Sequence, residues 1–175
     1  MNLKKNVHLK IIFLFAIFLL TIPVNAQSER KLREEAIFYP VTRIVDGDTF
    51  WVDDGSEKGM KVRLTGVDAP ETRNSRNKVK AAFGDESTRY MTGLIAGKKV
   101  RLEYDIDTLD QYGRTLAYVY LEDGTFVNAS MVGNGYATVM TTPPNVRHAG
   151  TFVELAQKAR KRERGLWKQE EQMAH

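Results

Sequence analysis

Five short runs rich in β-branched or alternating residues lie within positions 41–121, and they constrain the fold more than any other feature. Two runs, 60–65 and 100–104, alternate with a period of two, as half-buried strands do. Their shared-face apolar residues are Met60, Val62 and Leu64, then Val100, Leu102 and Tyr104, while Lys61, Arg63 and Thr65 face the other way. The other runs cover 41–45, 49–52 and 116–121, with Asp-Gly turn signals between the early ones. Five strands of this length predict a small barrel.

Three helical segments accompany the strands. Segment 85–96 carries apolar residues at helical spacing and stops at Gly97, and segment 126–134 is closed by Gly135. The last segment starts with a capping-box pattern at Thr151 and Glu154 and ends before Gly165. Its apolar stripe consists of Phe152, Leu155, Ala156 and Ala159. Strands and helices together predict an α+β fold.

The composition limits the chemistry that is open to the chain. Its 175 residues are 42% hydrophobic and 27% charged, which is typical of one globular domain. The absence of cysteine excludes a disulfide scaffold, a thiolate zinc site, an iron–sulfur cluster and a cysteine nucleophile. The three histidines, among them His148, have no evident partners in the sequence.

The first 26 residues have the layout of a secretory signal peptide. Three lysines precede an apolar run at 11–20, and Val24 and Ala26 place small residues at the third and the last position before a cut after Ala26. A membrane anchor is the alternative, but it needs about 20 apolar residues. We therefore expect a cleaved bacterial signal peptide at 1–26, a secreted or periplasmic location, and no stable membrane association.

Removal of residues 1–26 takes away three lysines and no acidic residue, so the mature chain carries 23 basic and 22 acidic groups. Attraction for a polyanion must then come from the local placement of charge, because the net charge is small. We divide the mature chain into a charged arm at 27–36, one domain at 37–168 and a polar tail at 169–175.

Three short clusters could carry chemistry, although each is a weak signal alone. They are Asp46-Gly47-Asp48-Thr49, Val67-Asp68-Ala69-Pro70-Glu71 and Asp110-Gln111-Tyr112-Gly113-Arg114. In isolation they are typical of a turn, of a helix start with proline in its first position, and of a loop with a solvated arginine. A calcium-binding EF-hand loop beginning at Asp46 is excluded, because Phe50 and Trp51 stand where it needs an oxygen ligand and a glycine.

Taken together and in this order, the clusters resemble the staphylococcal nuclease (thermonuclease) family. The resemblance runs from Val41 through the strand at 62–64 and the segment DQYGRTLAYVY at 110–120 to Trp167, which is nearly the whole mature chain. It implies an oligonucleotide/oligosaccharide-binding (OB) barrel of five strands with three helices, in agreement with the count above. Because family members are usually monomers, it also implies a monomer.

The resemblance implies a calcium site. Asp48, Asp68 and the backbone carbonyl of Ala69 stand at the positions that hold Ca²⁺ in the family, and hard oxygen ligands are those that calcium requires. The family often has threonine at position 69, but alanine at this position provides the same backbone carbonyl. Asp46 is expected to support the site from beside these ligands.

The resemblance also implies catalytic residues. Glu71 matches the glutamate usually assigned as the general base that activates the attacking water. Arg63 and Arg114 match the two arginines that clamp the phosphate, where guanidinium groups answer the negative charge gained in the transition state. Tyr112 matches a tyrosine that contacts the bound nucleotide, and a partly packed surface ring is the alternative.

Two departures from the family concern substrate binding. The best-known member has a lysine where this chain has Gln111, and a pair of tyrosines where this chain has TTPP at 141–144. We therefore expect weaker nucleotide binding and a different end-group or base preference. The basic residues Arg73, Arg76, Lys78 and Lys80 either compensate or are plain solvated surface. The basic turn at 158–164 is better explained by the helix dipole.

The sequence thus predicts a secreted, calcium-dependent, sugar-nonspecific nuclease that hydrolyses DNA and RNA to 3′-phosphate products. Preference for single-stranded substrate follows from the narrow groove of an OB barrel. Two alternatives stay open: a barrel that has lost catalysis and only holds nucleic acid or a partner, and an oligosaccharide-binding toxin subunit of the same barrel class. Neither of these alternatives requires the five residues that this chain has together, which are Asp48, Arg63, Asp68, Glu71 and Arg114.

Overall fold

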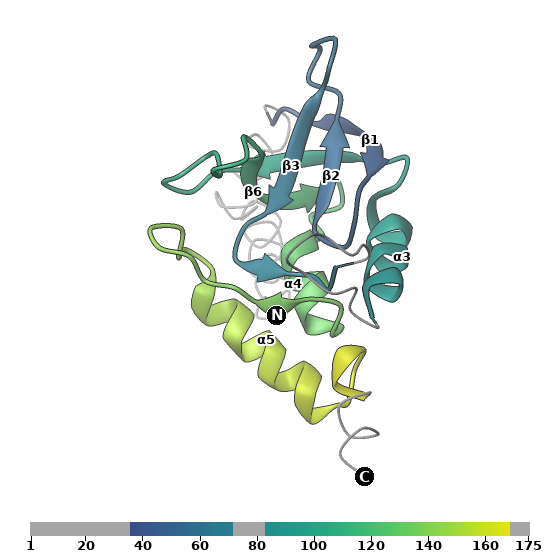
Figure 1. Ribbon diagram of the computed structural model, residues 1–175, viewed down its shortest axis with the longest axis vertical. Helices are drawn as coiled ribbons and strands as arrows, with labels where there is room; N and C mark the ends of the chain where they lie inside the picture. The colour runs from purple at the N-terminus through teal and green to yellow at the C-terminus, as the bar shows by residue number, and fades with distance from the viewer. Residues whose placement is uncertain (1–35, 72–82, 169–175) are drawn as a thin grey trace, which may run out of the picture. The chain divides into compact units, whose positions relative to one another are not determined.

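The computed structural model describes residues 36–71 and 83–168 (Figure 1). The predicted signal peptide, residues 27–35 of the charged arm, the basic residues from Arg73 to Lys80 and the polar tail lie outside this part of the chain. What the sequence predicts for those segments stays a prediction.

Five strands form a closed barrel in the order β1-β2-β3-β6-β5. They are β1 (Tyr39–Ile44), β2 (Thr49–Val52), β3 (Met60–Leu64), β5 (Lys99–Glu103) and β6 (Thr115–Leu121). Neighbouring strands are antiparallel except β3 and β6, which run parallel, and the pairing of Tyr39 with Val100 closes the barrel between β1 and β5. Each predicted run overlaps one of these strands, with ends that differ by at most two residues, so the predicted five-stranded barrel of the OB type is confirmed.

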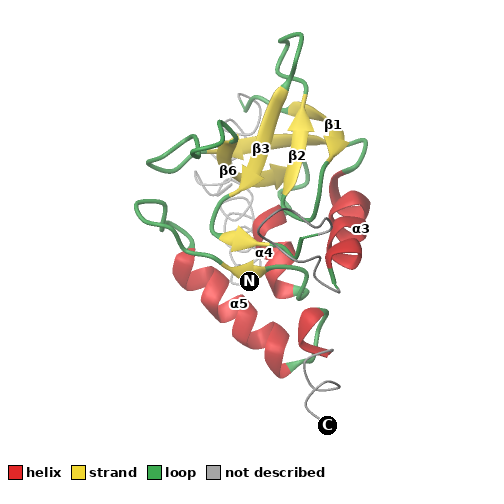
Figure 2. Ribbon diagram, in the orientation of Figure 1, coloured by secondary structure: helices red, strands yellow, loops and turns green. Residues whose placement is uncertain are grey.

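Two further strands, β4 (Val67–Asp68) and β7 (Thr138–Val139), pair antiparallel in a small sheet of their own outside the barrel (Figure 2). The sequence did not predict them, because a strand of two residues has no period to detect. Their pairing sets Asp68 opposite Thr138, and the Thr138 hydroxyl donates a hydrogen bond to the Asp68 carbonyl at 3.2 Å. The start of the second sequence cluster is therefore fixed by a segment 70 residues further along the chain.

Three helices occupy the predicted segments: α3 (Gly84–Ile95), α4 (Val127–Gly133) and α5 (Ala149–Lys161). Helix α4 lies between the barrel and α5 (Figure 1). The predicted apolar stripe of α5 is confirmed, since Phe152 and Ala159 are buried and Leu155 and Ala156 half-buried. Among the described residues no helix is both long and apolar enough to cross a membrane.

The capping-box prediction for α5 is wrong. The helix begins at Ala149, two residues before Thr151, and its N-cap residue His148 makes no side-chain capping bond. Glu154 lies 3.8 Å from Lys158 one turn later in the same helix. The pattern misled because an exposed Thr-x-x-Glu within a helix has the same spacing as one at its start.

Aromatic packing explains why α5 begins where it does. The His148 ring meets Tyr118, Phe126 and Phe152 at centroid distances of 4.4, 5.0 and 6.0 Å. The histidine that had no evident partner in the sequence therefore has partners in space, which come from β6, from the residue before α4 and from α5.

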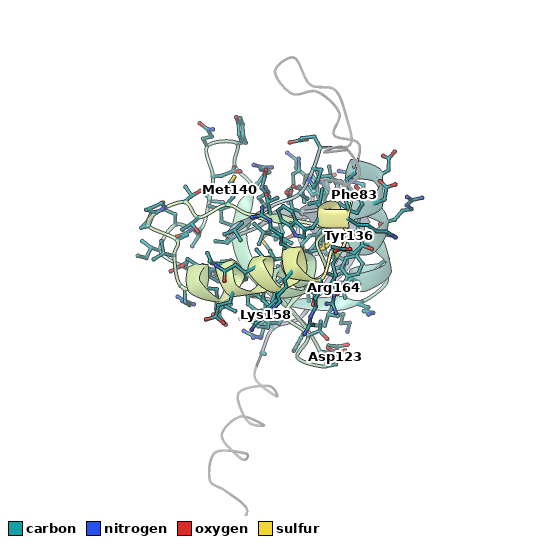
Figure 3. All side chains as sticks on the ribbon, turned by 90° about the horizontal axis from the view of Figure 1, so that it is seen from below. Phe83, Asp123, Tyr136, Met140, Lys158 and Arg164 are labelled. Atoms are coloured by element: carbon teal, nitrogen blue, oxygen red, sulfur yellow. The ribbon has the colours of Figure 1, made fainter. Side chains whose placement is uncertain are left out.

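A second aromatic contact lies at the start of α3. Phe83 stacks on Tyr136 with ring centroids 5.5 Å apart, away from Met140 (Figure 3).

The core fills the barrel and the space beneath it, with Phe50, Leu64, Met91 and Phe152 among its fully buried side chains. The expected alternation fails at two places. Arg63 and Thr65, on the face opposite to Val62 and Leu64, are buried as well, because turns and β4 cover this end of β3. Tyr104, predicted to continue the buried face of β5, follows the end of that strand and is 40% exposed.

Asn128 joins α4 to the barrel through hydrogen bonds that are entirely buried. Its Oδ1 accepts from the Val119 N–H at 2.9 Å, and its Nδ2 donates to the Thr65 carbonyl at 2.9 Å. One side chain thus satisfies a backbone group of β6 and a backbone group of the turn that follows β3.

We expect Asn128→Ala to lower the free energy of unfolding by about 2–4 kcal/mol, because it leaves a buried N–H and a buried carbonyl unpaired. Ser130→Ala in the same helix is the control, since the Ser130 hydroxyl donates only to the Phe126 carbonyl four residues back. Its loss should stay below about 1 kcal/mol. Urea unfolding of both variants measures the difference, and equal losses would contradict the role given to Asn128.

Candidate active site

All the candidate residues line one cavity of about 550 Å³ at the end of the barrel where β3, β4 and the approach to β6 meet. The structure thus brings together residues from all three sequence clusters and from the β3 strand. The candidates in its wall are Asp46, Asp48, Arg63, Asp68, Ala69, Glu71, Tyr112 and Arg114.

Asp48 lies in the turn between β1 and β2, and its carboxylate is buried. The Ala69 N–H donates to Oδ2 at 2.7 Å and the Thr49 hydroxyl donates to Oδ1 at 2.9 Å. Asp46 closes the turn by accepting the Asp48 N–H at 3.1 Å. The two aspartates therefore have different tasks, since Asp46 shapes the turn and Asp48 reaches across to the segment after β4.

Gly47 makes the close approach of this turn possible. A Cβ at this position would overlap the Ser87 side chain of α3 and would lie 2.7 Å from the Ala69 Cβ. The Asp46-Gly47 dipeptide is thus more than a turn signal, because it lets the turn pack between a helix and the Asp68–Glu71 cluster.

Arg63 connects the two aspartates that the sequence predicts as metal ligands. Its Nη1 lies 2.9 Å from Asp48 Oδ2, and its Nη2 lies 2.8 Å from Asp68 Oδ1. Nη1 also donates to the backbone carbonyls of Leu64 at 3.2 Å and Val67 at 2.9 Å. The guanidinium group therefore fixes the turn between β3 and β4 as well as both carboxylates.

Burial raises the pKa of Asp48 to about 7, from an ordinary value of 3.8. The positive charge of Arg63 and the Ala69 N–H lower this pKa, whereas the neighbouring Asp46 raises it. Desolvation is the largest of these effects, so the carboxylate is only partly compensated by the protein around it. A cation beside Asp48 would relieve that cost.

Arg114 is held by a residue to which the sequence analysis gave no role. Its Nε lies 2.6 Å from Asp110 Oδ2, and Asp110 Oδ1 accepts the N–H groups of Tyr112 and Arg114 at 2.8 and 3.0 Å. The Tyr112 ring lies 5.5 Å from the Arg114 guanidinium carbon and is 75% exposed, which agrees with a ring available to a ligand. The signal that could have identified Asp110 is its place at the start of a turn that contains Gly113, because an aspartate there often accepts the N–H two residues on.

The opposite wall of the cavity contains residues that the sequence analysis missed. Asn145 accepts the Asp107 N–H and donates to the Asp107 carbonyl, both at 2.8 Å, and so joins two loops that are 38 residues apart. Leu109 and Met140 add exposed apolar side chains to this wall. Gln111 and Thr142, where family contacts were expected to be missing, do line the cavity. No sequence signal pairs position 107 with position 145.

The donor atoms of the cavity suit a hard cation. Asp48, Asp68 and Ala69 all line the cavity, and the atoms predicted as ligands, two carboxylates and the Ala69 carbonyl, offer only oxygen, as calcium prefers. In the ranges 36–71 and 83–168, no group of three or more acidic or histidine side chains is gathered closely enough to form a metal site by itself. Any ion held here therefore needs backbone or water oxygens in addition to the two carboxylates.

Similarity to known proteins agrees with this site. The family described as "Staphylococcal nuclease homologue" matches residues 61–169. A "Thermonuclease" of Staphylococcus intermedius is 39% identical over 143 residues, which cover 81% of each chain. A "Thermonuclease" of Staphylococcus hyicus is 36% identical over 130 residues, covering 74% of this chain and 75% of its own. An "Uncharacterized endonuclease" of Escherichia coli O157:H7 is 39% identical over 130 residues, covering 73% and 74%.

The closed five-stranded barrel, the cavity at its end and the thermonuclease and endonuclease relatives together identify the protein as a nuclease, a hydrolase of phosphodiester bonds. The chain belongs to the staphylococcal nuclease family. The family match begins within β3, so the Asp46–Asp48 turn lies ahead of it and joins the site through the contacts of Asp48 with Arg63 and Ala69.

We expect Asp48→Asn to stabilise the protein above pH 7, by on the order of 4 kcal/mol, because about three pKa units separate the folded from the unfolded state. Folded Asp48 holds its proton up to a pKa of about 7, whereas an unfolded aspartate releases it near 3.8, so the wild type loses stability as the pH rises between these values. The advantage of the variant should vanish near pH 4. Guanidinium unfolding in the presence of a chelator at both ends of this window measures it. A variant less stable than the wild type above pH 7 would contradict the burial argument.

Proposed function

We propose that the protein is a secreted, calcium-dependent nuclease that hydrolyses DNA and RNA without regard to the sugar and leaves 3′-phosphate products. The observation that carries the proposal is the convergence of two carboxylates, a carbonyl, Glu71 and two arginines in one cavity. Secretion rests on the signal-peptide pattern at 1–26.

Asp48, Asp68 and the Ala69 carbonyl are the residues that would hold the calcium ion. When bound, the ion supplies Lewis-acid stabilisation of the negative charge on the phosphate oxygens. Ala69 is buried and its N–H is committed to Asp48, which fixes the orientation of its peptide unit. The Thr138 hydroxyl in turn donates to the Asp68 carbonyl, the other polar group of that same peptide unit, so the Asp68–Ala69 peptide is restrained on both of its sides.

Glu71 accepts a proton from the attacking water in the proposed reaction. The water oxygen forms a bond to phosphorus and the bond from phosphorus to the 5′-oxygen breaks. The leaving 5′-oxygen takes a proton from solvent water and Glu71 returns its proton to solvent, so the products are a 3′-phosphate and a 5′-hydroxyl. Glu71 lies in the cavity wall two residues after Ala69, so its carboxylate comes from the same rigid segment as the ligands.

Arg114 binds the phosphate in this proposal. Because Asp110 holds its Nε, the guanidinium plane is oriented before substrate arrives, and its side chain is 26% exposed to the cavity. A preorganised fork of this kind answers the charge that develops on the phosphoryl oxygens. Tyr112 beside it offers a ring face to the neighbouring nucleotide.

We expect Glu71→Gln and Arg114→Ala each to reduce cleavage of denatured DNA by about 10²–10⁴-fold, because one removes the proton acceptor and the other removes the phosphate fork. Matched controls are Glu154→Gln on α5 and Arg89→Ala on α3, both exposed surface residues, which should keep wild-type activity. Wild-type cleavage should require calcium and stop with a chelator. Binding of DNA without any cleavage under these conditions would contradict the proposal.

We expect faster cleavage of denatured than of duplex DNA, because the site lies in a cavity of limited width at the end of an OB barrel. Initial rates on the same sequence in single-stranded and duplex form, at equal nucleotide concentration, measure the preference. Equal rates on both forms would overturn it.

A further inference from the structure

The guanidinium group of Arg63 contacts both of the carboxylates that are proposed as calcium ligands. Nη1 lies 2.9 Å from Asp48 Oδ2 and Nη2 lies 2.8 Å from Asp68 Oδ1, so each carboxylate already has a full positive charge within ion-pair distance. The Arg63 and Asp48 side chains are each 8% exposed, so water screens their contact little, whereas Asp68 is 35% exposed and its contact with Arg63 is screened more. Arg63 is thus a fixed cation beside both of these carboxylates.

The two arginines of the cavity differ in this respect. Arg114 makes its ion pair with Asp110, which is not one of the proposed calcium ligands, and its side chain is 26% exposed. Arg63 uses both Nη atoms on Asp48, Asp68 and the carbonyls of Leu64 and Val67. Nη2 of Arg63 carries a second N–H beside the one directed at Asp68, so a phosphate contact stays open to Arg63 as well. Arg63 therefore differs from Arg114 in that its charge also acts on the two carboxylates proposed as calcium ligands.

We propose that Arg63 is an internal counter-ion that sets the calcium affinity of the site: it holds Asp48 and Asp68 in place and at the same time competes with the ion for their charge. This inference rests on the proposed calcium site. The arginine keeps the two carboxylates close together without mutual repulsion, and so preserves the site at low calcium concentration. Its charge repels a divalent cation at the same carboxylates, and affinity falls as a result.

An affinity lowered in this way has a use in a secreted enzyme. Extracellular calcium-binding modules have dissociation constants of about 10⁻⁴–10⁻³ M, far weaker than those of cytosolic sensors. A built-in competing cation keeps the site in the weak range, so that it fills only where calcium is abundant. The nuclease would then stay inactive in compartments that are poor in calcium.

A purely structural role for Arg63 predicts the opposite change on substitution. If the guanidinium group only positioned Asp68 and the turn between β3 and β4, its loss would disorder the ligands and weaken calcium binding. If it competes with calcium, its loss tightens calcium binding while the stability measured with a chelator falls. The sign of the change in affinity therefore separates the two roles.

The experiment is calorimetric titration of calcium into the wild type, Arg63→Gln, Arg63→Lys and Arg114→Gln, at a pH above neutrality so that the carboxylates are ionised. We expect Arg63→Gln to bind calcium at least about tenfold more tightly than the wild type. Arg63→Lys, which keeps the charge but cannot bridge both carboxylates with a fork, should fall in between. Arg114→Gln is the matched control and should change affinity by less than about threefold, because Arg114 pairs with Asp110.

A second readout is thermal unfolding with chelator and with saturating calcium. Arg63→Gln should unfold at a lower temperature than the wild type with chelator, and calcium should raise its melting temperature by more than that of the wild type. If Arg63→Gln does not fold, the calcium affinity of Arg63→Lys relative to that of the wild type decides between the two roles.

The outcomes distinguish the inference from the function on which it rests. A wild type that binds no calcium would overturn the proposed metal site itself. Calcium binding by the wild type, with equal or weaker binding by the Arg63 variants, would leave the nuclease proposal standing and overturn the counter-ion role. Tighter binding that is equally large in Arg114→Gln would assign the effect to the overall charge of the cavity and would also overturn it.

Discussion

The buried carboxylate of Asp48 is the constraint on which the rest of the site depends. A carboxylate removed from water must find hydrogen-bond donors and positive charge, or it will not stay ionised. Here the donors come from three separate segments: Thr49 at the start of β2, Arg63 on β3, and Ala69 just after β4. Satisfying one side chain therefore ties together the β1–β2 turn, the barrel and the small sheet. The residual cost keeps the pKa of Asp48 near 7, so the site carries stored electrostatic free energy that a cation can release.

The charge balance of the described cavity wall supports the proposed dependence on a metal ion, independently of the family resemblance. Its described wall contains two arginines and six acidic residues, namely Asp46, Asp48, Asp68, Glu71, Asp107 and Asp110. Both arginines are already paired with carboxylates. A phosphate backbone entering such a cavity would be repelled, because like charges in a partly desolvated site are weakly screened. The proposed calcium ion would reverse the local sign of the charge where the substrate has to bind.

The cavity is held open by two different kinds of support. On the side of Asp68 and Glu71, the β4–β7 pair and Arg63 fix the backbone of the segment that holds the proposed calcium ligands. On the other side, the amide of Asn145 pairs with the backbone of Asp107, and Arg147 lies 2.8 Å from Glu103. On this side, polar contacts between loops thus fix the backbone, as strand pairing does on the first side. Leu109 and Met140 remain exposed there and available to a ligand.

The sequence by itself determined the five barrel strands, the three helices, the clusters that carry the site and the nuclease family, because these follow from local periodicity and from short motifs. It could not determine α5's starting residue, the two-residue strands or the burial of Arg63, since each depends on what packs against the segment. Asp110 was within reach of the sequence, at the start of the turn that contains Gly113. The pairing of Asn145 with Asp107 was not, because it joins atoms 38 residues apart. Tertiary structure alone decided that Arg63 meets both ligand carboxylates, since that contact depends on where β2, β3 and β4 meet in space.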